Sequence, residues 1–308
     1  MNRLTVLLAG LGIFVAVGLI VPHISSGPKG DGNAPANVTV VITRDYGKIL
    51  LQMAQFPPTS GLTAMEMLHN MTSVETRYGG MYVYSMFGLK SDLAKKLDWL
   101  YYVNGVYMDR GLASYRPQQG EVVQVDYHYW GSYPPSPGFL SGYPAKLAYG
   151  LHGKKSNITI VAGREVRKEA EDLARVITQL AGREPTIVEA SSLTEDRRDE
   201  DLIVLATPQT ASLYQEVVEW RKNVYWFSSL EDGKLWLNGL ERGHRTELEH
   251  GCAIQCMDFP GKGIWAVIVL ATDERWMAEG LRYLNEGSAG YSAAFAATPS
   301  GIVLLPVE

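Results

Sequence analysis

The apolar run near the N-terminus constrains this chain more than any other feature of its sequence. Residues 4–21 read LTVLLAGLGIFVAVGLIV, with Arg3 before the run and no ionisable side chain inside it. A helix of that length crosses a bilayer, and a buried soluble helix, which is the alternative, seldom lacks a polar face. Pro22 follows the run directly, where a cleavable signal peptide would have a small-x-small cleavage site. We therefore expect residues 1–24 to form an uncleaved signal anchor and transmembrane helix.

The charges that flank this run predict where the rest of the chain lies. Arg3 is the only positive charge that precedes the run, so the positive-inside rule places the short N-terminus in the cytoplasm. A lipoprotein would need a cysteine just after the apolar run, and the first cysteine of the chain is Cys252. We expect a single-pass protein of the cell membrane whose bulk is extracytoplasmic.

Composition narrows the function classes. A chain of 308 residues exceeds the usual size of one compact core, and a hydrophobic share of 46% with a charged share of 20% is typical of folded domains. The net charge of −5 includes no basic block, which excludes nucleic acid as a partner. In the strand-like stretch GCAIQCMDF, Cys252 and Cys256 would lie roughly 13 Å apart. They are too distant for a disulfide there, and we predict two buried thiols.

The first half of the chain has the pattern of a small α+β domain. Residues 25–36, SSGPKGDGNAPA, predict a flexible spacer. In the segment 37–130, Thr63 and Glu66 form a capping box before a short helix, and the Asn104-Gly105 pair between two β-rich runs is a strong hairpin signal. The order hairpin, helix, strands predicts a β-grasp-like domain, with one helix on a mixed sheet of about four or five strands.

The second half changes to an α/β pattern. Residues 131–156 carry several prolines and glycines without a period and predict an interdomain linker. In the segment 157–308, continuous apolar strands at 202–207 and 266–272 each lead into a helix, the first beginning near Gln209. Such strands alternating with amphipathic helices predict an α/β domain with a mostly parallel sheet.

Two further elements complete that second domain. The spacing of apolar residues predicts a helix over 164–181 that stops at Gly182. Residues 225–240, with an Asp232-Gly233 turn, predict an inserted hairpin.

The first domain resembles a known family through three stretches: TSGLTAMEML, GGMYVYSMFGL and DWLYYVNGVYMDRGLASYRPQQGEVVQVDYHYW. Its most specific portion is the run from Trp99 to Gly105, followed by the Gly120-Glu121 turn. Over residues 37–130 the chain is similar to the transcobalamin C-terminal-like (DUF4430-type) family, which occurs on exported bacterial proteins. In the animal carriers the related domain closes over a corrinoid against an α-helical barrel. The resemblance implies a β-grasp-like fold and makes cobalamin or a related corrinoid a candidate ligand, although residues 157–308 lack the paired-helix repeats of that barrel.

Aromatic side chains crowd this domain beyond what a small core buries. The last strand, 122–130, places Val123, Val125, Tyr127 and Tyr129 on one face. Rings with polar tips suit a recognition face for a planar macrocycle or a sugar, while a partner protein or the second domain would also account for them. The ligand-binding candidates are Tyr82, Tyr84, Tyr102, Tyr107, Tyr127 and Trp130.

The remaining candidate residues favour structural roles. His128, on the strand face opposite Tyr127, is interpreted as a lone surface histidine, and no metal site is predicted. Thr207 and Asp273 follow parallel strands, where α/β sheets place ligands, but helix N-capping explains both. The sequence has no nucleotide-binding loop after these strands, no nucleophile elbow and no zinc-protease motif. We predict no catalytic residues and no certain cofactor, and therefore not an enzyme.

The sequence thus predicts a membrane-anchored, extracytoplasmic binding protein. The first domain would capture a small molecule, such as a corrinoid, or a glycan, and the α/β domain would support or complete the site. The alternative is a structural or adhesive protein of the cell envelope that binds cell-wall polymer or a membrane partner. An enzyme acting on envelope polymers would need an acid/base pair in a cleft between the domains.

Overall fold

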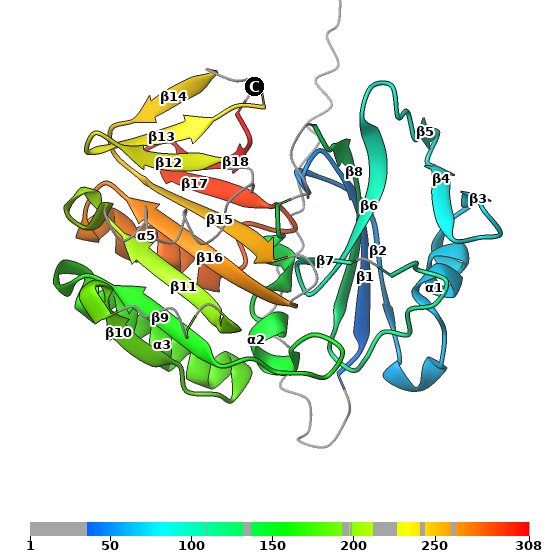
Figure 1. Ribbon diagram of the computed structural model, residues 1–308, viewed down its shortest axis with the longest axis horizontal. Helices are drawn as coiled ribbons and strands as arrows, with labels where there is room; N and C mark the ends of the chain where they lie inside the picture. Colours follow the sequence, from blue (N-terminus) through cyan, green and yellow to red (C-terminus); the bar gives the residue numbers. More distant parts are fainter. Residues whose placement is uncertain are drawn as a thin grey trace, which may run out of the picture.

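The computed structural model describes residues 36–108, 110–131, 137–192, 197, 199–211, 227–240, 244–259 and 263–307. These residues form a mixed α/β protein with several sheets, one of them mostly parallel (Figure 1). The predicted span at 4–21 lies outside the described residues. Within them, no helix combines the length and the apolar character that a membrane crossing needs. We call residues 36–131 the N-terminal module, 137–156 the connector and 157–307 the C-terminal module.

A five-stranded sheet in the order β2-β1-β8-β6-β7 is the centre of the N-terminal module. β1 and β8 are parallel, and the other neighbours are antiparallel. The short helix α1 covers one face, and its capping box between Thr63 and Glu66 is present as predicted. The strands and helices are β1 (Val38–Arg44), β2 (Ile49–Phe56), η1 (Pro58–Ser60), α1 (Ala64–Met71), β6 (Leu97–Val103), β7 (Val106–Tyr107) and β8 (Val122–Tyr129).

A small antiparallel sheet lies on the outer side of this module, beyond α1 and away from the C-terminal module (Figure 1). It comprises β3 (Glu75–Arg77), β4 (Tyr82–Met86) and β5 (Leu89–Lys90). The turn between β3 and β4 contains Tyr78, Gly79 and Gly80 at positive φ, which the two glycines adopt without strain.

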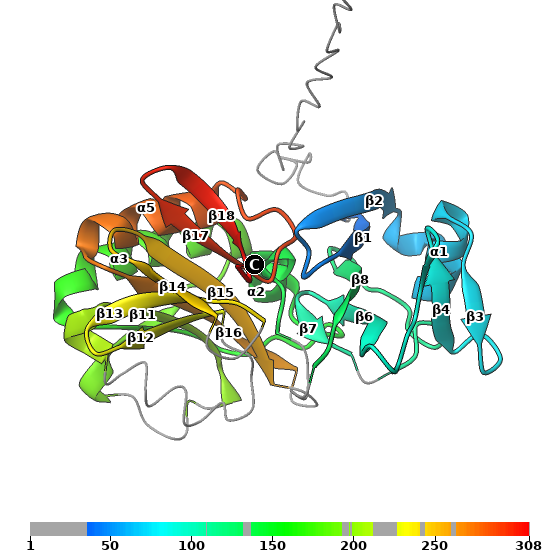
Figure 2. The ribbon, with the colours of Figure 1, turned by 90° about the horizontal axis from the view of Figure 1, so that it is seen from above.

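The connector packs between the two modules. It forms η2 (Leu140–Gly142) and α2 (Ala145–Tyr149), and it buries Phe139, Lys146 and Leu147 completely. Figure 2 shows the modules side by side, with the turn between β1 and β2 next to the strands that end the chain. There the amide of Ala293 donates to the carbonyl of Tyr46 at 2.9 Å. The modules therefore meet over both the connector and this second contact.

The C-terminal module is built on a seven-stranded sheet in the order β10-β9-β11-β16-β15-β17-β18. β10, β9, β11 and β16 are parallel, whereas β15, β17 and β18 pair antiparallel with their neighbours. The strands are β9 (Ile158–Ala162), β10 (Thr186–Glu189), β11 (Asp201–Ala206), β15 (Cys252–Phe259), β16 (Ile264–Ala271), β17 (Ala294–Thr298) and β18 (Gly301–Leu305).

Two helices and a small sheet cover the two faces of this sheet. α3 and α5 pack on one face, and the sheet β12-β13-β14 packs on the other. The helical elements are η3 (Arg164–Val166), α3 (Arg167–Ala181), η4 (Ala190–Ser192), η6 (Pro208–Thr210) and α5 (Glu274–Asn285), and the small sheet is β12 (Ser228–Glu231), β13 (Lys234–Asn238) and β14 (Arg245–Leu248).

Several local predictions for this module are confirmed. The strands expected at 202–207 and 266–272 are β11 and β16, which pair in parallel. Helix α3 ends at Gly182 in the left-handed conformation, and Asp273 caps α5 through the amide of Trp276. Both cysteines are free and buried. Most of the helix expected after Gln209 lies outside the described residues.

Candidate functional site

The two faces of the five-stranded sheet differ in chemistry. One face carries Val40, Val123 and Val125 and packs with α1 in an apolar core, as the alternation of the last strand predicts. The opposite face carries Gln124 and Asp126, and both are completely buried against the connector and the C-terminal module. A polar face can be buried only if its groups find hydrogen-bond partners.

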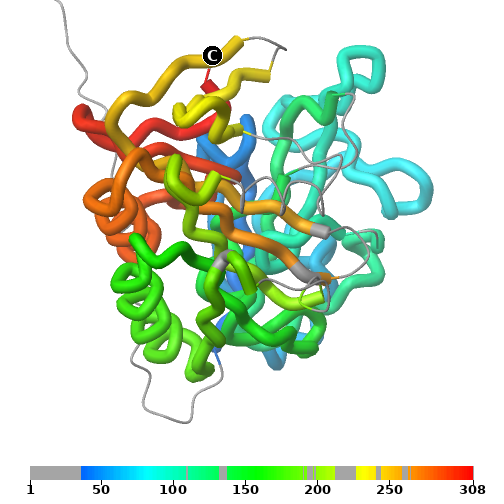
Figure 3. The backbone as a smooth tube through the Cα atoms, turned by 60° about the vertical axis from the view of Figure 1, so that its left-hand side comes forward, coloured from blue at the N-terminus to red at the C-terminus, as the bar shows by residue number. Residues whose placement is uncertain are grey.

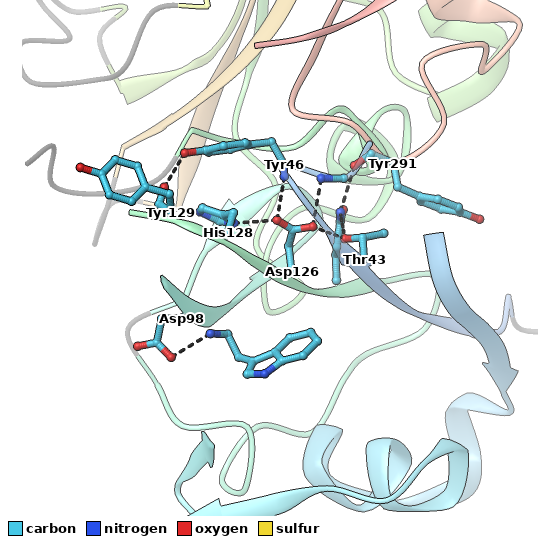
Figure 4. A network of polar contacts seen from close by, with 10 residues as sticks. Thr43, Tyr46, Asp98, Asp126, His128, Tyr129 and Tyr291 are labelled. Atoms are coloured by element: carbon cyan, nitrogen blue, oxygen red, sulfur yellow. Dashed lines mark hydrogen bonds and ion pairs between the residues drawn. The ribbon is translucent and has the colours of Figure 1, made fainter. Parts of the chain in front are cut away.

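Asp126 is the centre of those partnerships (Figure 4). Its Oδ1 accepts from Thr43 Oγ1 at 2.5 Å and from the Gly47 amide at 2.9 Å. Its Oδ2 accepts from the Tyr46 amide at 3.0 Å and lies 2.6 Å from His128 Nδ1. The carboxylate thus fixes the turn between β1 and β2, and that turn is the one that contacts the C-terminal module.

His128 corrects the sequence interpretation. It was expected on the surface, but it is 2% exposed and lies within an aromatic cluster. Its ring centroid is 4.5 Å from that of Tyr46 and 6.2 Å from that of Phe139 in the connector. The Thr43 hydroxyl donates a hydrogen bond to Asp126 and accepts one from the Gln124 side chain at 2.9 Å. It therefore contacts the carboxylate of this group rather than the imidazole. These contacts fit a structural role, in which Asp126 and His128 help to hold the N-terminal module against the connector and the C-terminal module.

The Asn104-Gly105 turn forms a second set of contacts with the connector and the C-terminal module. Asn104 Oδ1 accepts from the Val122 amide at 2.8 Å, and its Nδ2 donates to the Gly150 carbonyl of the connector at 2.7 Å. Its backbone carbonyl accepts from the Trp265 indole at 3.0 Å. A Cβ on Gly105 would lie 2.2 Å from the Phe139 carbonyl oxygen. The predicted hairpin turn is therefore also the docking point for the rest of the chain, a role its sequence alone does not indicate.

A buried ion pair anchors the connector to the C-terminal module. Lys146 Nζ lies 2.7 Å from Asp201 Oδ2, and both side chains are completely buried. Burial raises the pKa of Asp201, while Lys146 and the Trp265 amide, 3.2 Å from Oδ1, act in the opposite direction. Sequence reasoning missed this pair, although the signal exists: Lys146 lies in the apolar run AKLAY, and Asp201 begins an apolar strand.

The six predicted ligand-binding residues divide among three places. Tyr102 and Tyr107 lie toward the connector and the C-terminal module: the Tyr102 ring is 4.4 Å from that of Phe139, and the Tyr107 amide donates to Asp258 at 2.6 Å. Tyr127 packs its ring 5.1 Å from that of Trp99. These three are partly or wholly used by packing.

The other three predicted residues lie on the outer side of the N-terminal module. Tyr82 and Tyr84 are half-buried on β4, and Trp130 follows β8 with 37% of its surface exposed. The Arg77 guanidinium lies 3.5 Å from the centroid of the Tyr84 ring. Tyr82 donates to Asp98 at 2.8 Å, and burial raises the pKa of its phenol, which remains a donor at neutral pH.

Metal-ligating side chains do not gather in the described part of the chain. No group of three or more His, Cys, Asp or Glu residues there has the proximity to hold an ion. Thr207 and Asp273, which follow parallel strands, both cap the helical element that comes after them. Thr207 exchanges hydrogen bonds with Thr210, and Asp273 lies at the N-terminus of α5. The Thr207 hydroxyl also donates to Glu165 at 2.9 Å.

Comparison with known proteins identifies part of the N-terminal module. Residues 61–129 match the family model of a domain of unknown function, DUF4430. No curated protein matches the sequence. Among solved structures, a protein from Ruminococcus gnavus, provisionally described as metal binding, is 15% identical over 30% of this chain and 95% of its own, with a TM-score of 0.25.

Proposed function

We propose, from the premise that residues 61–129 are a DUF4430 domain, that this is a non-catalytic binding protein displayed on the outer side of a membrane. The N-terminal module captures the ligand, and the C-terminal module supports the N-terminal module. The apolar run at 4–21 supports the membrane location. One helix on a mixed five-stranded sheet supports the β-grasp-like assignment that the family resemblance implies.

The observation that carries the proposal is the placement of the aromatic side chains. Because the C-terminal module and the connector bury the polar face of the five-stranded sheet, we place the ligand on the outer side of the N-terminal module. There Tyr82 and Tyr84 leave part of their rings open, and the Tyr78 ring is 6.0 Å from that of Tyr82. Arg77 adds a guanidinium above Tyr84.

These residues suit a particular ligand chemistry. Tyrosine rings stack on planar or sugar-like surfaces, and a guanidinium beside them binds carboxylate or phosphate groups. A corrinoid combines a planar macrocycle with polar side chains, in agreement with the family resemblance. The ligand that we expect is therefore a ring-bearing small molecule with an anionic or strongly polar substituent.

Calorimetric titration of the full chain in detergent with cobalamin and with cobinamide tests the proposal. We expect saturable binding that Tyr84→Ala weakens about fivefold, since a stacked aromatic pair contributes about 1 kcal/mol. Trp236→Ala is the matched control, because Trp236 in the C-terminal module also lies under an arginine, with the Arg245 guanidinium 4.2 Å from its ring centroid. Equal loss in both variants, or no heat at millimolar ligand, would contradict corrinoid capture.

A structural role in the cell envelope is the second candidate. It is favoured by large apolar side chains that stand exposed on turns of the N-terminal module, led by Tyr78 at 73% exposure. Co-sedimentation of the same variants with purified cell-wall polymer separates the two functions. Retention on the polymer without any small-molecule binding would favour this candidate.

A further inference from the structure

Two turns of the N-terminal module both combine exposed apolar side chains with a nearby cation. The first, residues 77–81, reads RYGGM, and the second, residues 92–96, reads DLAKK. Tyr78, Met81 and Leu93 are 73%, 66% and 66% exposed, the highest values among the large apolar side chains of the described residues. Each turn thus projects apolar side chains into solvent and has a cationic side chain beside them.

The two turns are linked through one residue. The chain segments that lead into and out of them meet at Asp98, whose Oδ1 accepts from Tyr82 Oη at 2.8 Å and from Ser91 Oγ at 2.7 Å. The turn between β3 and β4 lies at the outer edge of the module, whereas the turn between β5 and β6 lies at the upper end of β6 (Figures 1 and 3). The two turns therefore point in different directions, and the second is considered by itself below.

The second turn is held in a defined shape. An isolated bridge joins Asp92 to Leu97, and the Asp92 carboxylate accepts from the Lys95 amide at 3.1 Å. That hydrogen bond lowers the pKa of Asp92, so the carboxylate is charged at neutral pH. With Lys96 in the left-handed conformation at φ +55°, the backbone holds Leu93 at the tip. The exposure of Leu93 is thus built into the turn.

An aromatic side chain and a cation stand at the base of this turn. The Trp130 amide donates to the Lys96 carbonyl at 2.9 Å, and the Lys96 ammonium lies 5.8 Å from the centroid of the Trp130 ring. Lys95 is 74% exposed and its ammonium lies 3.2 Å from Asp92 Oδ2, so the turn, with two lysines and one aspartate, carries one net positive charge. Aliphatic tips, an interfacial tryptophan and flanking lysines are the combination that proteins use at membrane–water interfaces.

We propose that the turn 92–96 docks on an anionic bilayer surface. Leu93 enters the interfacial region, and Lys95 and Lys96 contact lipid phosphates, while Arg77 and Tyr78 stay with the ligand site proposed above. The net charge of the chain is −5, so an anionic surface repels the protein as a whole, and this local set of cations supplies the complementarity. The inference rests on the proposed membrane location only for the presence of a bilayer nearby.

A fluorescent label at the tip tests this directly in the full chain. Leu93→Cys carries a nitrobenzoxadiazole label, and Cys252 and Cys256, both buried, do not compete for it in the folded protein. Leu180→Cys is the matched control, because Leu180 is an exposed leucine, at 38%, on helix α3 of the C-terminal module. Both proteins are reconstituted into phosphatidylcholine vesicles with and without about 30% phosphatidylglycerol.

We expect blue-shifted emission and quenching by lipid-borne nitroxide at position 93 in the anionic vesicles only, and at position 180 in neither. Lys95→Gln combined with Lys96→Gln lowers the docked-to-free ratio about 25-fold, because each lysine near an anionic surface contributes a factor of about five. Water-like emission at position 93 in vesicles that retain the full chain overturns the docking inference, but it does not contradict the proposed membrane anchor. A full chain that does not stay with the vesicles contradicts the membrane location itself. A blue shift that appears equally without phosphatidylglycerol, or that scales with protein density and so indicates a second copy, also overturns it.

Discussion

The two faces of the five-stranded sheet are buried by different means at the middle of β8. Val125 points into the apolar core with α1, and Asp126, the next residue on β8, points toward the C-terminal module, and both are completely buried. The apolar face requires only complementary shape, because dispersion and the hydrophobic effect are not directional. The polar face requires each donor and acceptor to meet its partner. A docking built this way permits one relative placement of the two modules.

The polar face is bonded to both the connector and the C-terminal module. Gln124 Nε2 donates to the Tyr291 carbonyl of the C-terminal module at 2.9 Å, and Gln124 Oε1 accepts from Ser141 of the connector at 2.5 Å. Both bonds would be lost together if the modules shifted. We infer that the polar face determines the placement of the N-terminal module, while the apolar face supplies most of its stability.

Substitutions at two neighbouring residues of β8 should give the largest change in the free energy of unfolding, and they test the difference between the two faces. Asp126→Ala leaves two amides, a hydroxyl and an imidazole without their shared acceptor, and we expect it to lower the free energy of unfolding by about 3–5 kcal/mol. Val125→Ala, its neighbour on the apolar face, should cost about 2 kcal/mol through lost burial and a small cavity. Urea unfolding followed by tryptophan fluorescence measures both. A smaller loss for Asp126→Ala than for Val125→Ala would contradict the role of the polar face.

The Asn104-Gly105 turn gives the next largest effect. Gly105 has φ +76°, and a methyl group there would lie 2.2 Å from the Phe139 carbonyl oxygen, so Gly105→Ala combines backbone strain with a clash against the connector. Gly88 has φ +77° with nothing within 4 Å, and Gly88→Ala shows the strain alone. We expect about 1–2 kcal/mol for Gly88→Ala and about 2 kcal/mol more for Gly105→Ala. Differential scanning calorimetry of both variants checks the difference, and equal melting temperatures would show that the turn does not hold the connector.

Sequence periodicity predicted which residues share a face, but not what covers that face. The alternation along 122–130 correctly placed Val123 and Val125 together, and the capping box at Thr63 and Glu66 is local chemistry that a sequence specifies directly. His128 was assigned to the surface because a polar strand face normally meets solvent. The partner that buries it is far along the chain, and periodicity contains no information about such a contact.

The same reason applies to the aromatic candidates. Composition indicated more rings than a small core holds, and the structure assigns Tyr102 to the packing against Phe139 while Tyr82 and Tyr84 remain on the outer side. Which rings serve packing and which stay open depends on where the C-terminal module docks. The glycine that permits the docking, Gly105, was predicted as a turn residue only, because the clash it avoids is with residue 139 and not with its neighbours.

The smallest expected effect is at the N-terminus of α1, on the apolar side of the contrast. If packing supplies most of the stability on that face, a helix cap there contributes little, and Thr63→Ala should cost about 1 kcal/mol. The Thr63 amide and hydroxyl lower the pKa of Glu66 below its usual 4.5, so the carboxylate contribution is present above that value and is lost as the pH falls through the lowered pKa. The difference in urea midpoint between wild type and Glu66→Gln should therefore be present at neutral pH and vanish in acid. A difference that persists in acid would show that the Glu66 side chain acts through packing rather than through its charge. The N-terminus of α1 would then be stabilised in the same way as the apolar face of the sheet that it covers.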